Sequence, residues 1–369
     1  MRLVSAAVFV SLFAACTNPP ATESTEATGS STQPIIDGTA SSADQDFVVE
    51  LASRQLGKIY EECTATLIAK NLVLTARHCV GELDGAGTNV RNFAATAFEI
   101  YKGRDAQKRI DANAKPDAKG TKLFTTAGTK MVPDVALILL DQPVTGVPIS
   151  KIRLDGGTKK GELLDVVGYG YDQRGAAPAT RMQRSGVGVA NIGPATMPTF
   201  QIISGEFLLG EAACLGDSGG PALSADTHAV VGVVSRVYSE TEATAADPVA
   251  YCKGTAAQSV YTTLAPVKDL VLQAFDAAGT QPYLETDTAP PVDPDAADPT
   301  TPDPGSADES APAQSPARKL SSTPSSAGGC SIGATTDAVA DAASSIVLVA
   351  LFGVVRAARR ISSRRRAQS

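Results

Sequence analysis

One serine in this sequence stands among three glycines, in the segment Cys214-Leu215-Gly216-Asp217-Ser218-Gly219-Gly220-Pro221. The glycines permit a tight turn that exposes the Ser218 hydroxyl, and they let the backbone N–H groups of Gly216 and Ser218 point at one place. A serine hydroxyl is a weak nucleophile that needs a neighbouring base. The segment predicts a nucleophile beside an anion-binding pair of amides. A glycine-rich β-turn without chemistry is the alternative.

A candidate base follows an apolar run, in Leu72-Val73-Leu74-Thr75-Ala76-Arg77-His78-Cys79. The chain contains two histidines, His78 and His228. Imidazole changes its charge near neutral pH, so it is the commonest general base. A lone histidine at the end of a strand is more often structural. The prediction that His78 is a general base therefore depends on its flanking residues and on its candidate partners.

A candidate carboxylate, Asp134, comes directly before the apolar run Val135–Leu140. By itself, an aspartate at that place is better explained as a turn residue. Asp141 borders the far end of the same run and fits a catalytic role less well. The order along the chain is therefore His78, Asp134 and Ser218.

These three segments, in this order, resemble the motifs of the chymotrypsin-like (trypsin-like) serine proteases, including Thr-Ala-x-His-Cys around the histidine. The resemblance extends from Ile35 to about Ala278. It implies an all-β fold, a double six-stranded antiparallel β-barrel with a C-terminal helix and a site between the barrels. It also implies a serine endopeptidase that hydrolyses peptide bonds of proteins or peptides through an acyl-enzyme.

The resemblance also assigns roles to residues. Ser218 attacks the scissile carbonyl, His78 takes its proton, and Asp134 orients the imidazole. The N–H groups of Gly216 and Ser218 form the oxyanion hole. No cofactor is implied, and no metal site is predicted, because His78 and His228 have no partners at ligand spacing.

The pattern of the middle of the chain agrees with an all-β fold. Short apolar runs recur between Gly, Pro, Asn and Asp residues, which is typical of sandwiches and barrels. The apolar spacing of Val267, Leu270, Val271 and Phe275 predicts one closing helix. The expected strands include Thr64–Ile68, Leu72–Ala76, Val135–Leu140, Leu163–Gly168, Ala229–Val237 and Ser259–Leu264.

Four cysteines in this region, Cys63, Cys79, Cys214 and Cys252, allow three pairings. The resemblance selects Cys63 with Cys79, and Cys214 with Cys252. The remaining two cysteines, Cys16 and Cys330, stand in the terminal regions.

The segment Ile35-Ile36-Asp37-Gly38 resembles the new N-terminus of activated family members. The resemblance implies that a cut before Ile35 frees an amine that pairs with Asp217. Pro34 departs from the family, whose usual activators cut after Arg or Lys. The activating protease is therefore unidentified, and the form before the cut is expected to be a zymogen.

The specificity pocket is predicted by counting from Ser218. Ala212 occupies the position at which enzymes that cut after Arg or Lys carry an aspartate. Ser235 and Val237 match one wall of the pocket, and Ser259 matches the other. Without a carboxylate to neutralise a basic side chain, and with Val237 narrowing the pocket, we expect a small aliphatic residue before the cut.

The N-terminus predicts export. Residues 1–16 combine a charged Arg2, an apolar run and Ala14-Ala15, as in a signal peptide. Cys16 after two alanines resembles a bacterial lipoprotein processing site, with an ordinary signal peptide as the alternative. Residues 17–34 read as a spacer or propeptide. Export lets the cysteines oxidise, so we expect a cell-envelope, outer-surface or extracellular protein.

The C-terminus predicts a stalk and an anchor. Residues 279–329 are rich in Pro, Asp, Ala, Ser and Thr, a composition typical of disordered segments. Residues 330–369 contain Cys330, an apolar run and an arginine cluster. This tail resembles the C-terminal sorting signals of myxobacterial surface proteins, and a simple membrane tail anchor is the alternative.

The charge balance excludes one class of partner and leaves two alternatives to the protease. A net charge of −7, with no basic patch in the middle of the chain, argues against nucleic acid. A non-catalytic binding module on the same fold is one alternative, although His78, Asp134, Ser218 and Gly216 are all present. A surface protein built around its acidic stalk is the other, but the stalk lacks the spacing of a calcium loop.

Overall fold

The computed structural model describes residues 35–84, 88–127, 133–172, 175 and 180–291. The predicted signal peptide, the spacer, most of the predicted stalk and the sorting tail lie outside the described residues, and so do Cys16 and Cys330. Among the described helices, none is long and apolar enough to cross a bilayer.

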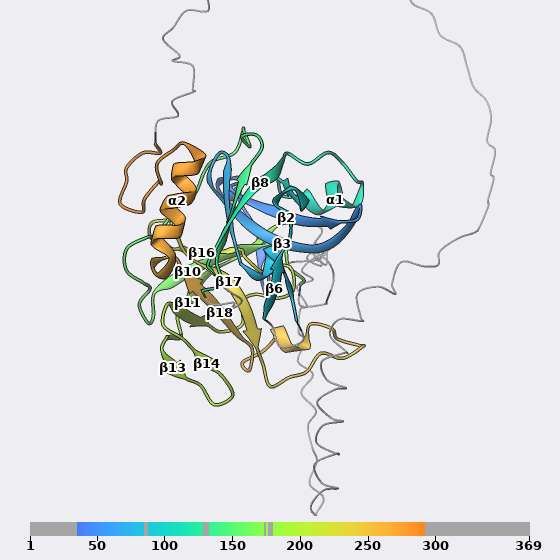
Figure 1. Cartoon of the computed structure of the whole chain (residues 1–369). Coiled ribbons are helices and arrows are strands. Elements are labelled where there is room, and N and C mark those ends of the chain that lie inside the picture. Colours follow the sequence, from blue (N-terminus) through green and yellow to red (C-terminus); the bar gives the residue numbers. More distant parts are fainter. Residues whose placement is uncertain (1–34, 85–87, 128–132, 173–174, 176–179, 292–369) are drawn as a thin grey trace, which may run out of the picture.

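The first half of the domain is a closed antiparallel barrel of six strands (Figure 1, blue to green). Its strands fill the interior with Val, Leu, Ile and Ala, in a chain that contains no Trp. Around the barrel the order is β2 (Val48–Gln55), β3 (Lys58–Ala69), β4 (Leu72–Thr75), β9 (Ala136–Leu140), β8 (Ala118–Thr125) and β7 (Phe98–Tyr101). A two-stranded sheet, β5 (Gly81–Leu83) with β6 (Asn89–Asn92), lies after β4.

The second half is an eight-stranded sheet of antiparallel neighbours. Six longer strands carry its core, and a two-residue strand stands at each end. The order is β1 (Thr39–Ala40), β11 (Met182–Gly188), β10 (Leu163–Gly168), β16 (Pro221–Ser224), β17 (Val230–Tyr238), β18 (Gln258–Thr263), β15 (Glu206–Leu209) and β12 (Asn191–Ile192). A separate hairpin joins β13 (Ala195–Thr196) to β14 (Gln201–Ile202). The all-β class with two strand-built halves is thus confirmed.

The described residues contain two short α-helices, one between two strands and one after the last strand. The helix α1 (Ala106–Asp111), between β7 and β8, was not predicted. The predicted closing helix is present as α2 (Lys268–Ala278), which buries Val271, Ala274 and Phe275 in the main core (Figure 1, orange). The 3-10 turns are Ala43–Gln45, His78–Val80, Ala95–Ala97, Ala250–Cys252 and Ala265–Val267.

Residues beyond the predicted boundary at Ala278 also contact the domain. Gly279 ends α2 in the left-handed conformation, with φ 71°, and the chain then turns back onto the domain. Ile152 donates its N–H to Tyr283 O, and Glu285 donates its N–H to Ile152 O, both at 2.9 Å. The first residues of the predicted stalk therefore pack as part of the protease domain, because backbone pairing and ion pairs hold them there.

The two halves share one core. Leu223, Val230 and Val233 of the second sheet belong to the same buried cluster as the barrel interior and α2. This shared core sets the barrel and the sheet in a definite relation, so residues from both can build one site between them.

Candidate active site

The pairing of β4 with β9 brings His78 and Asp134 together. Thr75, the last residue of β4, lies opposite Ala136, the first residue of β9. His78 follows β4 in a 3-10 turn, and Asp134 precedes β9. His78 Nδ1 lies 2.8 Å from Asp134 Oδ2, and the His78 backbone N–H donates to Asp134 Oδ1 at 3.0 Å. This double contact orients the imidazole.

Asp134 receives a further hydrogen bond from the second half of the domain. The Ser235 hydroxyl donates to Asp134 Oδ2 at 2.7 Å. Ser235, which was predicted to belong to one wall of the specificity pocket, thus directs its hydroxyl to this carboxylate. A β-bulge explains this orientation, because β17 and β18 shift register between Val234 and Arg236 and the extra residue is Ser235.

The charges at this place influence one another. Burial disfavours the Asp134 carboxylate, but the charge of His78 and the hydrogen bonds from His78 and Ser235 outweigh it and lower the pKa of Asp134. Burial opposes the imidazolium, yet Asp134 raises the pKa of His78 above its ordinary value, with a further contribution from Glu61. Sequence reasoning missed Glu61, a half-buried residue of β3 whose own pKa is raised chiefly by burial.

The turn that contains Ser218 is tied to the elements that carry His78 and Asp134. Thr64 of β3 donates its backbone N–H to Ser218 O at 2.9 Å. Its neighbour Cys63 is bonded to Cys79, the residue after His78. On the other side, Gly219 donates its N–H to Val234 O at 2.9 Å, directly before Ser235. The structure thus places the Ser218 turn between the barrel and the sheet, next to both partners.

Two glycines of this turn have no room for a side chain. Gly216 has φ 91°, and a Cβ there would lie 2.9 Å from Gly170 Cα. Gly219 has φ 79°, and a Cβ there would lie 2.1 Å from Thr75 Oγ1. Positive φ and close neighbours together require glycine at both positions.

The predicted oxyanion amides are available to a ligand. Tyr171 donates its N–H to Leu215 O at 2.7 Å, which directs the N–H of Gly216 to the opposite side of the trans peptide. In the part of the chain that the structure describes, neither the Gly216 N–H nor the Ser218 N–H donates to a protein acceptor. Both residues are half-buried, so their N–H groups can donate to an acceptor on a substrate.

Both disulfides implied by the resemblance are present. Cys63 is bonded to Cys79, and Cys214 is bonded to Cys252. Among the described residues, one group of potential metal ligands lies close together, namely Cys63, His78 and Cys79. Its two sulfurs are bonded to each other, so they offer no thiolate to a metal ion.

Asp217 is fully buried beside the turn. Its carboxylate accepts the N–H of Gly170 at 2.7 Å and of Cys214 at 2.9 Å. Burial raises the pKa of Asp217 to about 7, although these two hydrogen bonds oppose the rise. Within the described ranges no basic side chain pairs with this carboxylate, so it is a buried acid that lacks a cation.

Ile35 is also fully buried, in the cluster that contains Ala212 and Ala213. The next residue, Ile36, donates its N–H to Ala212 O at 3.2 Å. Ile35 has φ 59°, a conformation that β-branched residues avoid. The segment that begins at Ile35 is therefore inserted beside the residues that precede the Ser218 turn.

The residues of the predicted specificity pocket lie on adjoining segments. Val237 of β17 lies opposite Ser259 of β18. The Ser259 hydroxyl accepts the Ala213 N–H at 3.1 Å, and Ala212 is fully buried. Ala212, Val237 and Ser259 are thus brought close in space, whereas the Ser235 hydroxyl is directed to Asp134.

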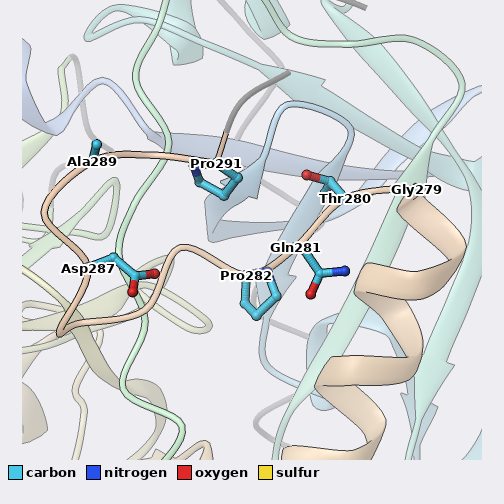
Figure 2. Close-up of a pocket in the computed structure, with 7 residues that line it drawn as sticks. All are labelled: Gly279, Thr280, Gln281, Pro282, Asp287, Ala289 and Pro291. Carbon is cyan, nitrogen blue, oxygen red and sulfur yellow. The ribbon is translucent and has the colours of Figure 1, made fainter. Parts of the chain in front are cut away.

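The cavity in Figure 2 lies elsewhere, in the segment after α2. It has a volume of about 480 Å³ and is lined by Gly279, Thr280, Gln281, Pro282, Asp287, Ala289 and Pro291. None of these residues contacts His78, Asp134 or the Ser218 turn in the interactions described above, so this cavity is separate from the candidate active site.

Comparison with known proteins identifies the family. The sequence model of the family named Trypsin matches residues 35–260, more than half of the chain. The chain belongs to the trypsin family. This trypsin-like domain is a serine endopeptidase, as the resemblance of its motifs implies. A relative of known activity, the vitellin-degrading protease of Bombyx mori, is 27% identical over 199 residues, covering 48% of this chain and 69% of the relative.

Proposed function

We propose that this trypsin-like domain cleaves peptide bonds with Ser218 as nucleophile, His78 as general base and Asp134 as the group that orients His78. The carrying observation is the contact of His78 Nδ1 with Asp134 Oδ2 at 2.8 Å, beside the Ser218 turn. A carboxylate on Nδ1 keeps the proton there and leaves Nε2 free to accept the Ser218 proton. Asp134 then stabilises the imidazolium, which returns the proton to the leaving amine.

The tetrahedral intermediate carries a negative charge on the former carbonyl oxygen. The proposed donors to this oxyanion are the N–H groups of Gly216 and Ser218, which have no protein acceptor among the described residues. The acyl group then passes from Ser218 to water, with His78 acting as base a second time. No cofactor or metal enters this sequence of steps.

Activation is proposed to follow a cut before Ile35. The freed amine would pair with Asp217, a buried carboxylate that has no cation among the described residues. An N-terminal residue has no preceding carbonyl, so the cut also removes the strain of φ 59° at Ile35. The activating protease is one that accepts Pro34 before its cut.

The proposed preference is for a small aliphatic residue before the scissile bond. Ala212 provides no carboxylate for a basic side chain, and Val237 narrows the space opposite Ser259. The proposed location is the bacterial cell surface or the medium, reached through the signal in residues 1–16 and held by one or both tails. The two disulfides agree with an oxidising compartment.

The test uses protein that begins at Ile35 and extends to Pro291, so that the packed segment after α2 is included. Wild type and Ser218→Ala are treated with a fluorophosphonate probe and incubated with casein. Ser185→Ala is the matched control, because Ser185 is an exposed serine of β11. We expect labelling and cleavage in wild type and the control, both abolished in Ser218→Ala, with cuts after small aliphatic residues. A folded, disulfide-bonded wild type that is not labelled would instead favour a binding module.

A further inference from the structure

Arg236 links the Ser235–Asp134 contact to a buried carboxylate. Its Nη1 donates to the Ser235 hydroxyl at 3.3 Å and to Glu206 Oε1 at 2.5 Å, and its Nη2 donates to Glu206 Oε2 at 2.9 Å. The Nε–H donates to the Tyr238 hydroxyl at 3.2 Å. Glu206, Arg236, Ser235, Asp134 and His78 therefore form one continuous hydrogen-bonded series across the second sheet and the barrel.

The chemistry of the guanidinium gives this series a direction. An arginine donates hydrogen bonds and accepts none. When Arg236 donates to the Ser235 oxygen, the hydroxyl hydrogen of Ser235 must point elsewhere, and the acceptor within reach is Asp134 Oδ2. A serine without such a neighbour could rotate and accept a bond in place of donating one.

Glu206 keeps the guanidinium in place. Its side chain is 1% exposed, and its Oε2 also accepts the Ile203 N–H at 2.9 Å. If Arg236 swung into solvent, it would leave a buried carboxylate without its counter-charge, which is costly. The rigid fork of the guanidinium serves Glu206 and Ser235 at once, a geometry that a lysine cannot reproduce.

We propose that Arg236, held by Glu206, is a positioning residue of the active site that fixes the Ser235 hydroxyl as a donor to Asp134. This inference rests on the proposed function, because it acts on the residue that orients His78. Arg236 and Glu206 carry opposite charges, so the pair orients Ser235 while adding no net charge beside Asp134.

The effect on His78 follows from electrostatics. A hydrogen bond to a carboxylate disperses part of its charge. Without the Ser235 bond, Asp134 would attract the imidazolium more strongly, and His78 would lose its proton only at a higher pH. The other charged groups that act on His78 and Asp134 are Glu61 and Arg77, and all variants below retain them.

The test is a double-mutant cycle on the active enzyme. Its corners are wild type, Ser235→Ala, the charge-balanced pair Arg236→Met with Glu206→Gln, and all three changes together. Each protein is assayed for kcat/KM against pH on a peptide substrate and for the rate of fluorophosphonate labelling. Circular dichroism and thermal unfolding establish that each protein is folded.

We expect Ser235→Ala and the charge-balanced pair each to shift the acid limb of the pH profile of kcat/KM to a pH that is higher by about 0.5 to 1 unit. At a pH below this limb, kcat/KM should then be about threefold to tenfold lower than in wild type. Because Arg236 acts through Ser235, the combined protein should show no further change. If the pair fails to fold, Arg236→Lys replaces it. The lysine keeps the charge and lacks the fork, so the same upward movement is expected.

Two results would overturn the inference while leaving the proposed function intact. One is an unchanged pH profile in the Arg236 variants, and the other is an additive loss in the combined protein. An inactive and unlabelled wild type would instead overturn the proposed function itself.

Discussion

Replacing Asp217 by asparagine should remove a pH dependence of stability from the uncleaved protein. The Asp217 carboxyl has a pKa of about 7 in the folded chain, against an ordinary value of 3.8, because burial disfavours its charged form. A folded-state pKa above the unfolded value means that the folded protein binds the proton more tightly. Its stabilising effect is therefore complete below the ordinary pKa and is lost as the pH rises through about 7.

The size of this effect follows from the two pKa values. The folded and unfolded pKa values differ by about three units, and each unit corresponds to about 1.4 kcal/mol. The free energy of unfolding should therefore fall by roughly 4 kcal/mol between pH 4 and pH 8. This is a large part of the stability of an ordinary domain. An asparagine does not titrate, so the variant should lack this loss. Its one carbonyl oxygen can accept the N–H of Gly170 or of Cys214 but not both, because these two groups bind different oxygens of Asp217.

The measurement is urea unfolding of uncleaved protein at pH 4 and pH 8, with Ser218→Ala in both samples to prevent self-cleavage. The free energy of unfolding should fall by about 4 kcal/mol more in the Asp217 protein than in Asp217→Asn. Other buried acids, such as Glu50, titrate in both proteins and cancel in the difference. An equal fall in both would refute the argument that Asp217 is buried without a counter-charge.

Cleavage before Ile35 should move this loss of stability to a higher pH. The freed Ile35 amine would keep the Asp217 carboxylate charged, so the loss near neutral pH should disappear. Pairing raises the pKa of an amine above its reference value of roughly 8, and the stabilisation is then lost as the pH rises through that higher value. An identical pH dependence in the cleaved and uncleaved proteins would show that the amine and Asp217 do not pair.

Two further substitutions test the turn and the packed C-terminal segment. Gly219→Ala should lower the free energy of unfolding in urea by about 2 kcal/mol or more and abolish fluorophosphonate labelling. Gly57→Ala is the control, because Gly57 has a similar positive φ with open space around it and therefore measures the backbone cost alone. An equal loss of stability in both variants would contradict the steric argument. Glu285→Gln should lower the free energy of unfolding by about 1–2 kcal/mol and leave kcat unchanged, because Glu285 accepts two hydrogen bonds from Arg153 at 2.6 and 2.7 Å. The control is Glu240→Gln, at an exposed residue. An equal Tm in the two variants would show that the segment around Glu285 does not stabilise the domain.

Much of the candidate site is predictable because its signals are local. The glycines around Ser218 form a turn with positive φ, as their sequence predicts. The apolar runs before His78 and after Asp134 form strands that are buried in the barrel. Such preferences depend on a few neighbouring residues, so they are visible in the chain itself. The joint role of His78, Asp134 and Ser218 and the pairing of the cysteines were predicted only through the resemblance to a family.

Other features were decided by the tertiary structure. The bulge at Ser235 turns a residue of the expected pocket wall onto Asp134, because one extra residue in β17 changes which side its hydroxyl faces. The composition of residues 279–329 predicted disorder, yet Glu285 in this range accepts hydrogen bonds from Arg153, 132 residues away.

Alone, the amino-acid sequence predicted a tight turn around Ser218 and the approximate positions of several strands, although β3 begins at Lys58 and not at the expected Thr64. It did not determine that Arg236 meets Glu206, two residues 30 positions apart on β17 and β15. A contact between strands depends on their register and on the strand between them, here β18. Those relations exist only once the sheet has formed, which is why folding, and not local preference, assigned the partners of Asp134.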